Sequence, residues 1–422
     1  MDRLHFGSFD AERRWRPGRL ARLPSAPAAQ TDRITAAMDE VLCAGCEPDD
    51  VLATARPMSP VLLEALHRAR LGCETVVVPG PDDLPVEERF ADRGVGPWLP
   101  RYGDLTPAPY AVVPRTHDAF ACLGVSASLP DIEAVSLVNS KTFSNQLVNE
   151  LGLFGGAVLA RSPGQLRSLC TDLGAEEGRV LVKDPYGVSG RDALIVDTPR
   201  VLDTVVRVLE RQVEQGNEVE LLVQPLFHVA QSFSGHLLID RAGRLKPLGL
   251  QVTANHGFAF AGSATAPLWL ERAADRAGYP ELLVTLGKIL FTAGYYGPVC
   301  VDSLLLEDGR IVPVLEINAR GSMGLLNLTL AGGIADRTVR PRLRVRQIRL
   351  DDDGLTDRLL RELHSARLLW PGHGAGIMPL ASGTLVPPRG RLFYALFAGG
   401  AAEFKALETS LDGLLAAARR PA

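Results

Sequence analysis

The chain has 422 residues, with 45 Lys and Arg against 49 Asp and Glu, for a formal net charge of −4. This balance lacks the basic excess that drives binding to a phosphate backbone, so no nucleic-acid partner is expected. No apolar run approaches the ~18 residues of a membrane-spanning helix, and residues 1–10 carry no apolar signal segment. We therefore expect a cytoplasmic protein of several domains, with no membrane partner.

The N-terminal part predicts a βαβ unit and hence a parallel sheet. Residues 1–30 are rich in Arg, Pro and Ala and lack periodicity, so we expect an arm or loop outside the core. The predicted elements are a strand at 51–53, a helix over 59–69 with Ser59 as N-cap and Pro60 in its first turn, a strand at 75–78, a long loop over 81–109 and a strand at 111–113.

The six cysteines include one close pair, Cys43 and Cys46. A zinc site would need a second pair or histidines at ligand spacing, and none follows. The pair also precedes the first clear strand, which is the wrong place for a thioredoxin-type motif. We interpret these cysteines as buried thiols, with a metal or redox role as the alternative.

From residue 135 onward the chain alternates helices and strands and shows no internal repeat. The predicted elements are a helix over 141–152, strands at 180–183 and 193–196, a helix over 201–215, strands at 219–227, 232–239 and 245–252, a helix over 282–293, strands at 299–306 and 311–317, a helix over 357–366, a strand at 391–397 and a helix from 401.

The most informative segment is the predicted hairpin over 299–317. Glu316 and Asn318 lie two residues apart on one strand, so their side chains leave the same face. Asp302 joins them if the connecting loop has three residues and ends in Gly309, because residue 302 then lies diagonally beside Glu316. A two-residue loop would place Asp302 on the other face.

Carboxylate and amide oxygens in this arrangement suit Mg²⁺, and Arg320 continues the row with a cation for phosphate. The alternative is an edge hairpin with a polar, solvated face. Because the flanking residues are strongly apolar, we favour the metal site with Asp302, Glu316 and Asn318 as ligands.

Two lysines complete the pattern. Lys183 ends a predicted strand and precedes a loop that contains Gly187, Val188, Ser189 and Gly190. No Gly-Lys-Ser/Thr follows, so this is not a Walker A loop, but its backbone amides can form an anion nest over phosphates. Lys141 heads a predicted helix; each lysine alone is also compatible with an ordinary surface position.

Taken together, residues 138–330 resemble the ATP-grasp superfamily of carboxylate–amine ligases. The strongest match is the run from residue 315 to Arg320, with Asp302 upstream, followed by Lys141 before the first subdomain and Lys183 before the glycine loop. The resemblance implies an α/β ATP-grasp fold that follows a Rossmann-like domain. The implied division is a Rossmann-like domain at 1–135, the grasp subdomains at 136–218 and 219–350, and a C-terminal α/β extension at 351–422.

The same resemblance implies nucleotide contacts at the strand that ends in Gln224, Pro225 and Leu226. Many members carry acids at the positions of Gln224 and Gln231. Gln224 can still contact adenine, whereas Gln231 lacks the carboxylate that usually contacts ribose or substrate.

The implied reaction transfers the γ-phosphoryl group of ATP onto a carboxylate, and an amine then attacks the acyl phosphate. The implied cofactors are ATP and one or two Mg²⁺ ions, with Mn²⁺ as an alternative. Lys141 and Lys183 would contact phosphates, Arg320 would stabilise the transferring group, Ser322 would orient the donor carboxylate, and residues 187–190 would close over the nucleotide.

We expect an amino-acid carboxylate to be joined to the amine of an amino acid or small peptide, and the resemblance is compatible with a homodimer. A carboxylase, a purine-pathway ligase and a non-catalytic ATP-binding protein are the alternatives. An NAD(P)-dependent oxidoreductase is disfavoured because no Gly-x-Gly-x-x-Gly follows the first strand. His228 and His256 have no partner at fixed spacing, so a structural role is expected for both.

Overall fold

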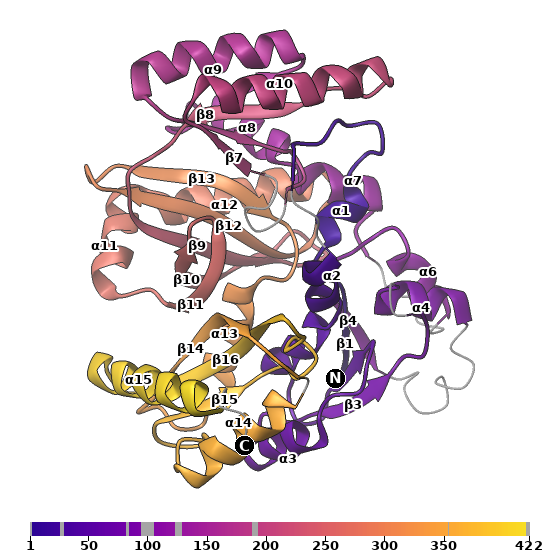
Figure 1. Ribbon diagram of the computed structural model, residues 1–422, viewed down its shortest axis with the longest axis vertical. Helices are drawn as coiled ribbons and strands as arrows, with labels where there is room; N and C mark the ends of the chain where they lie inside the picture. The colour runs from indigo at the N-terminus through magenta and orange to yellow at the C-terminus, as the bar shows by residue number, and fades with distance from the viewer. Residues whose placement is uncertain are drawn as a thin grey trace.

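The computed structural model describes residues 2–25, 29–81, 84–93, 105–122, 129–187, 193–352 and 354–418. Three β-sheets organise these residues, and helices cover their faces (Figure 1). The mixed α/β class expected from the sequence is confirmed.

The N-terminal sheet has four parallel strands in the order β3-β2-β1-β4. Its elements are β1 (Arg3–Phe6), α1 (Ala11–Trp15), α2 (Ala29–Ala36), the 3-10 helix η1 (Met38–Gly45), β2 (Val51–Thr54), α3 (Pro60–Arg68), β3 (Glu74–Val77), α4 (Val86–Arg93), β4 (Thr106–Pro109) and α6 (Thr116–Cys122). The predicted βαβ unit is therefore present, with Ser59 capping α3 as expected.

The strand predicted at 111–113 is wrong, since β4 lies four to five residues earlier. The amides of Thr106 and Tyr110 donate to the carbonyls of Asp2, just before β1, and of Phe6, so the prolines between them turn their missing N–H groups away from the pairing. An edge strand tolerates proline on that side. Ala111 and Val113 are buried by packing, not by strand pairing.

The expectation that residues 1–30 lie outside the core is also wrong. β1 is an inner strand of the parallel sheet, and Leu4 and Phe6 are fully buried in it. Further along, Ala21 and Leu23 insert into the hydrophobic core of the next subdomain. These apolar residues are scattered among Arg and Pro, so they bury themselves through distant contacts that leave no periodic pattern.

The second unit is a small antiparallel sheet in the order β5-β8-β6-β7. Its elements and the helices before it are α7 (Ile132–Val138), α8 (Lys141–Glu150), β5 (Val158–Ala160), α9 (Pro163–Glu177), β6 (Val180–Lys183), β7 (Ala193–Val196), α10 (Pro199–Glu214) and β8 (Leu221–Pro225). Figure 1 shows α9 and α10 side by side on the outer face of this sheet, at the end of the molecule remote from α15. β8 lies beyond the domain boundary expected at residue 218, yet it pairs with β5 and β6.

The third sheet has eight strands in the order β13-β12-β9-β10-β11-β14-β16-β15. Its elements and helices are β9 (Val229–Ile239), β10 (Leu245–His256), β11 (Ala259–Thr265), α11 (Leu268–Arg276), α12 (Tyr279–Thr292), β12 (Gly297–Leu306), β13 (Ile311–Asn318), α13 (Met323–Gly333), β14 (Arg340–Arg349), α14 (Leu355–Ser365), β15 (Gly376–Pro379), β16 (Arg389–Ala398) and α15 (Ala401–Ala418). The strands of the C-terminal part thus continue the sheet that contains the predicted hairpin.

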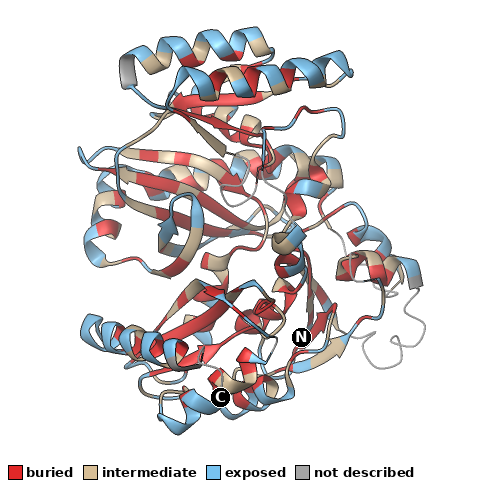
Figure 2. Ribbon diagram, in the orientation of Figure 1, coloured by how far each residue is buried: buried red, intermediate tan, exposed pale blue. Residues whose placement is uncertain are grey.

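Alternate residues of β9 face opposite sides of this large sheet. Gly235 faces α12, because a Cβ atom there would lie within 3 Å of Leu283 and Tyr279. Ser234 and His236 therefore project to the other side. Figure 2 shows buried strands through the centre of the molecule and exposed outer faces on α9, α10 and α15. Among the described residues, no helix is both long and apolar enough to cross a membrane.

Candidate nucleotide and metal site

The hairpin of β12 and β13 brings Asp302 and Glu316 directly opposite each other. Its loop pairs Leu306 with Arg310 through a hydrogen bond of 2.8 Å, and Gly309 has the positive φ of 85° that this three-residue loop requires. The predicted loop is therefore present.

The predicted diagonal relation between Asp302 and Glu316 is wrong, because a β-bulge follows the loop. Leu304 pairs with Val312, but Asp302 pairs with Glu316, so β13 holds two extra residues at the bulge. Pro313 lies in this stretch and has no amide hydrogen for the ladder, and the Ser303 hydroxyl donates to its carbonyl at 2.8 Å. A shift of two residues keeps both carboxylates on one face and moves them closer together.

Both carboxylates have polar partners in this site, and the Cys300 thiol donates to Asp302 Oδ1 at 3.5 Å. Asn318 Nδ2 donates to Asp302 Oδ2 at 2.9 Å, and Lys141 Nζ lies 2.8 Å from Glu316 Oε1. Burial, followed by the charge of Glu316, raises the pKa of Asp302 to about 6. Two facing acids that repel each other, with an amide oxygen beside them, form a donor set that a divalent cation would stabilise.

Within the described ranges, no group of three His, Cys, Asp or Glu residues is placed to hold a metal ion. The predicted set contains two carboxylates and one amide. Its fit to Mg²⁺ rests on hard oxygen donors, which this ion prefers and shares with phosphate oxygens.

The two predicted lysines converge on the same place from different elements. Ser140 caps α8 through the Phe143 amide, which positions Lys141 in the first turn, and Lys141 Nζ also donates to the carbonyl of Gly187 at 2.7 Å. Lys183 ends β6 and is buried, yet its side-chain amine has no hydrogen-bond partner within the described part of the chain. Burial lowers its pKa to about 8, although the charge of Glu316 opposes this shift. Of the predicted loop, Gly187 is described, whereas Val188, Ser189 and Gly190 lie outside the described residues.

Arg320 lies two residues after the end of β13, and its guanidinium donates hydrogen bonds to several groups. It donates to Asn318 Oδ1 at 2.9 Å, to the Gly321 carbonyl at 2.9 Å and to the Tyr110 hydroxyl at 3.4 Å. Arg320 Nε also donates to Glu12 Oε1 at 2.8 Å, and Nη2 reaches the same oxygen. All five donors of the guanidinium thus have a partner in the protein.

Ser322 is the N-cap of α13, and its hydroxyl oxygen accepts a hydrogen bond from the Leu325 amide at 3.1 Å. Its side chain also lies within hydrogen-bond reach of the Cys300 thiol, and the first turn of α13 directs backbone amides toward the same end of the helix. The predicted role of Ser322 in orienting a carboxylate stays a prediction.

The predicted nucleotide-binding strand is β8. Gln224 is buried and pairs with Leu181, while Pro225 ends the strand and Leu226 donates its amide to the Arg179 carbonyl. Gln231, on β9, donates its side-chain amide to the carbonyls of Ser232 and Thr253. A cluster of apolar side chains packs beside Phe227 in this connection, formed with Leu304, Leu306, Val312 and Leu315.

Three buried polar residues on the same face of the large sheet, Ser234, His236 and Gln251, were not predicted from the sequence. Ser234 pairs with Asp302 on one side and with Gln251 on the other, which extends the row that begins at Glu316. In the neighbouring row, His236 pairs with Cys300. Burial lowers the pKa of His236 to about 4, so its imidazole is neutral.

The polar residues of β9 were detectable in the sequence. The run from residue 232 to 236 alternates Ser, Ser and His with Phe and Gly, the same alternation of polar and apolar residues that identified Glu316 and Asn318. Gln251 hydrogen-bonds Asn327 Nδ2 at 2.7 Å, which links the row to α13.

Comparison with known proteins gives one curated relative and many similar structures, while no family model matches the chain. A butirosin acyl-carrier protein–L-glutamate ligase of Niallia circulans is 29% identical over 143 residues. These residues make up 34% of this chain and 33% of the relative, so the match spans about a third of that protein.

The solved structures match nearly the whole chain at low sequence identity. N5-carboxyaminoimidazole synthetase from Staphylococcus aureus has a TM-score of 0.54 at 9% identity and covers 97% of both chains. The biotin carboxylase domain of Hydrogenobacter thermophilus 2-oxoglutarate carboxylase, solved as a dimer with MgADP, ADP and bicarbonate, has a TM-score of 0.54 at 14% identity over 98% of this chain and 90% of that one. An L-amino acid ligase from Bacillus licheniformis has a TM-score of 0.51 at 14% identity over 87% and 98%. The chain has the ATP-grasp fold.

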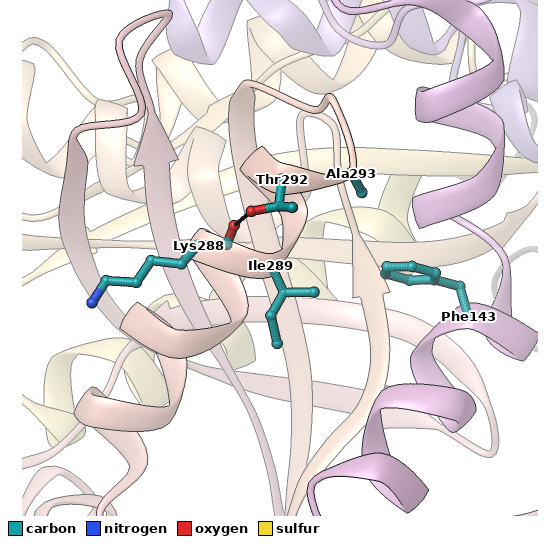
Figure 3. A pocket seen from close by; sticks show the side chains of 5 residues that line it. All are labelled: Phe143, Lys288, Ile289, Thr292 and Ala293. Atoms are coloured by element: carbon teal, nitrogen blue, oxygen red, sulfur yellow. Dashed lines mark hydrogen bonds between the residues drawn. The ribbon is translucent and has the colours of Figure 1, made fainter.

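Within the ATP-grasp fold, two cavities lie outside the residues predicted for nucleotide and metal. An apolar cavity of about 350 Å³ lies between α8 and α12, where Phe143 points toward Ile289 and Ala293 while the Lys288 amine points away (Figure 3). It contains no charged group directed inward, so we assign it no role. The second, of about 550 Å³, lies at the carboxyl ends of β1 and β2 and is lined by residues that include Arg13, Arg14 and Asp39.

The six cysteines are all free. Cys43 is buried and donates to the Leu380 carbonyl, while Cys46 lies beside Cys73. Burial raises the pKa of Cys43, so its thiol is protonated and unreactive at neutral pH.

Proposed function

We propose that this protein is an ATP-dependent carboxylate–amine ligase that joins an amino-acid carboxylate to the amine of an amino acid or small peptide. The observation that carries the proposal is the convergence of Asp302, Glu316 and Asn318 with Lys141 and Lys183 in the ATP-grasp fold. The two carboxylates and the amide suit a cation, the two lysines suit phosphates, and both sets lie at the same place in the fold. The intact acidic pair favours turnover over a purely regulatory ATP-binding role.

The proposed reaction has two steps. An oxygen of the donor carboxylate attacks the γ-phosphorus of ATP, the bond to the bridging oxygen breaks, and ADP leaves. The amine nitrogen then attacks the carbonyl carbon of the acyl phosphate, phosphate leaves with the electrons of the C–O bond, and the nitrogen loses a proton. The protein contributes mainly by positioning groups and neutralising charge.

The residues have distinct parts in these steps. Lys141 and Lys183 bind the phosphates of ATP, and the loop that begins at Gly187 excludes water that would hydrolyse the acyl phosphate. Arg320 stabilises negative charge at the transferring group, where its longest bond, to the Tyr110 hydroxyl, is the one that an oxyanion can replace. Ser322 and the first turn of α13 orient the donor carboxylate.

Asp302, Glu316 and Asn318 would hold Mg²⁺, as one or two ions, with Mn²⁺ as an alternative. When bound, the ion supplies neutralisation of the charge that develops between the β- and γ-phosphates. The facing carboxylates fit this role because burial, and then the charge of Glu316, raise the pKa of Asp302, and a cation would offset both effects.

The substrate class is supported by two relatives and opposed by others. The Bacillus licheniformis structure is named an L-amino acid ligase and the Niallia circulans relative is named a glutamate ligase. The other two solved structures are named a 2-oxoglutarate carboxylase and an N5-carboxyaminoimidazole synthetase, so those chemistries remain alternatives.

A second candidate is ligation of an amino acid to a carrier protein. The printed name of the Niallia circulans relative specifies an acyl-carrier protein as the partner of L-glutamate. In that case the acceptor nucleophile would belong to a carrier protein, and free amino acids would not support turnover as acceptors.

The test is release of phosphate from MgATP by the full chain, measured with all pairs of amino acids, then with bicarbonate, and then with glutamate plus an acyl-carrier protein. Release that needs two amino acids, with a dipeptide detected by mass spectrometry, supports the ligase. Release with bicarbonate alone indicates a carboxylase, and release only with the carrier protein indicates the second candidate. ATP binding without release under any condition would support the non-catalytic alternative.

A further inference from the structure

The N-terminal helix α1 contributes a buried carboxylate to the site, and the reaction described above leaves it without a role. Glu12 is only 2% exposed, and its Oε1 accepts hydrogen bonds from both Nε and Nη2 of Arg320. Its other oxygen, Oε2, is buried and has no partner among the described residues. Among the described residues, the side-chain hydrogen bonds of this carboxylate thus go to one guanidinium, which lies 308 residues away in the sequence.

The contacts of Arg320 show what this carboxylate controls. Glu12 occupies the Nε and Nη2 edge, and Asn318 Oδ1 accepts from Nη2 at 2.9 Å. The remaining nitrogen, Nη1, bonds the Gly321 carbonyl at 2.9 Å and reaches the Tyr110 hydroxyl at only 3.4 Å. Glu12 therefore fixes the plane of the guanidinium so that its most weakly bound donor, on Nη1, is the one left for a ligand.

A second contact holds the same part of the chain in place. The Gly321 amide donates to the Tyr110 carbonyl at 2.7 Å, and a Cβ atom on Gly321 would lie 2.6 Å from the Tyr110 ring. Tyr110 in turn stacks on Phe9, two residues before α1 begins, with ring centroids 4.1 Å apart. The N-terminal part of the chain thus contacts Arg320 through Glu12 and Gly321 through Tyr110.

We propose that Glu12 is a positioning residue for Arg320, which it holds in the orientation required for phosphoryl transfer. The proposal rests on the proposed function, because it gives Arg320 a task in that reaction. The arginine side chain has several rotatable bonds. If its guanidinium must become ordered at each turnover, the lost conformational entropy raises the barrier and slows the reaction. A carboxylate that binds two of its nitrogens orders it in advance.

A purely structural role for the ion pair predicts different behaviour. In that case Glu12 would only attach α1 to the large sheet, and its loss would lower stability without a specific effect on kcat. Glu40 provides a matched control, since it is equally buried in the same domain and binds backbone amides of Ser382 and Gly383, on the C-terminal part of the chain.

The experiment compares Glu12→Gln, Glu12→Asp and Glu40→Gln in the full chain. Glu12→Gln keeps the shape and one hydrogen-bond acceptor but removes the charge. We expect it to lower kcat by about 10- to 100-fold with the KM for ATP changed by less than about twofold, and we expect Glu12→Asp to recover part of the loss. Glu40→Gln should lower the melting temperature and leave kcat unchanged. A Glu12→Gln variant that loses stability but keeps its kcat would overturn the proposal.

A double-mutant cycle tests whether Glu12 acts through Arg320. In an Arg320→Lys background, Glu12→Gln should cost less than about threefold in kcat, because the partner that it positions is already altered. An equal loss in both backgrounds would also overturn the proposal.

One readout separates failure of this inference from failure of the proposed function. The Nε–H resonance of Arg320, identified by its absence in Arg320→Lys, should shift and exchange faster in Glu12→Gln, whatever reaction the protein catalyses. An unchanged Nε–H resonance would refute the positioning role even in an active ligase. A wild-type chain without turnover would refute the proposed function and leave this measurement valid.

Discussion

At the scale of single residues, the site is defined by charges that compensate one another. Lys141 neutralises Glu316, and Glu12 neutralises Arg320, while Asp302 and Lys183 lack an ion-pair partner among the described residues. The pKa values of these two groups are shifted, to about 6 for Asp302 and about 8 for Lys183. Groups that lack an ion-pair partner in the free protein are the ones whose charge a cation or a phosphate would balance.

Replacement of Glu316 tests the metal assignment. Glu316→Ala removes one of the two facing carboxylates, and we expect ATP turnover to fall by at least about 100-fold while the thermal unfolding curve keeps a single transition. The fold is expected to survive because Glu316 is only partly buried and Lys141 keeps its bond to the Gly187 carbonyl.

Glu307→Ala is the control for this change, since Glu307 is an exposed acid at the tip of the same hairpin and should tolerate the substitution. Turnover of Glu316→Ala at the wild-type rate would exclude Glu316 as a metal ligand. The measurement is release of ADP, followed alongside circular dichroism.

Lys183 predicts a specific pH dependence of ATP binding. Its pKa in the free protein is lowered to about 8, so below this value it carries a proton and can bind phosphate, and above it the charge is lost. The affinity for MgATP should therefore fall by about tenfold between pH 7 and pH 9, as the protonated fraction falls by that factor.

Lys183→Ala should bind more weakly at pH 7 and show no such decline, because the titrating group is gone. Isothermal titration calorimetry at several pH values measures both effects, and buffers of different ionisation enthalpy report the proton taken up near pH 8. An affinity that declines equally in the wild type and in Lys183→Ala would assign the titration to another group.

At the scale of elements, two N-caps of the same chemistry serve different purposes. Ser322 caps α13 beside the site, and Ser162 caps α9 on the outer subdomain, each through a hydrogen bond of 3.1 Å to a backbone amide. Either serine changed to alanine should reduce the free energy of unfolding by about 1 kcal/mol.

The two variants are expected to differ in kinetics. Ser322→Ala should also raise the KM for the carboxylate donor about tenfold, because it loses a hydrogen bond to a charged group. Ser162→Ala should leave that KM unchanged. Equal KM values in the two variants would restrict Ser322 to its capping role.

The elements also show which features are readable from sequence. The hairpin around Gly309 was predictable because polar residues alternate inside an apolar strand and a glycine ends the loop. The bulge at Pro313 was not, because it depends on how two strands share their hydrogen bonds. The arm before residue 30 was missed for the same kind of reason. Its buried residues and Glu12 contact partners hundreds of positions away, and such contacts leave no local period.

At the scale of the whole molecule, the large sheet joins the site to the C-terminal part of the chain. β14 pairs along its full length with β16, ten residues against ten, and β11 connects this pair to the strands that carry the site. α14 and α15 pack on the same strands and form one hydrophobic cluster with them. We therefore expect the tail and the site strands to unfold as one cooperative unit.

Two neighbouring residues of α15 test what holds this unit together. Leu411 is fully buried in the C-terminal hydrophobic cluster, whereas the next residue, Asp412, forms a half-exposed ion pair with Arg346. A buried leucine changed to alanine loses its transfer energy and leaves a cavity, so Leu411→Ala should reduce the free energy of unfolding by about 3 kcal/mol. Asp412→Asn should cost less than about 1 kcal/mol, because a solvent-exposed ion pair contributes little. Urea unfolding followed by circular dichroism measures both, and loss of ATP binding at the same urea concentration would confirm the shared transition. A larger cost for Asp412→Asn than for Leu411→Ala would contradict the dominance of apolar burial. ATP binding that persists after the tail has unfolded would show that the strands of the tail are not needed to support the site.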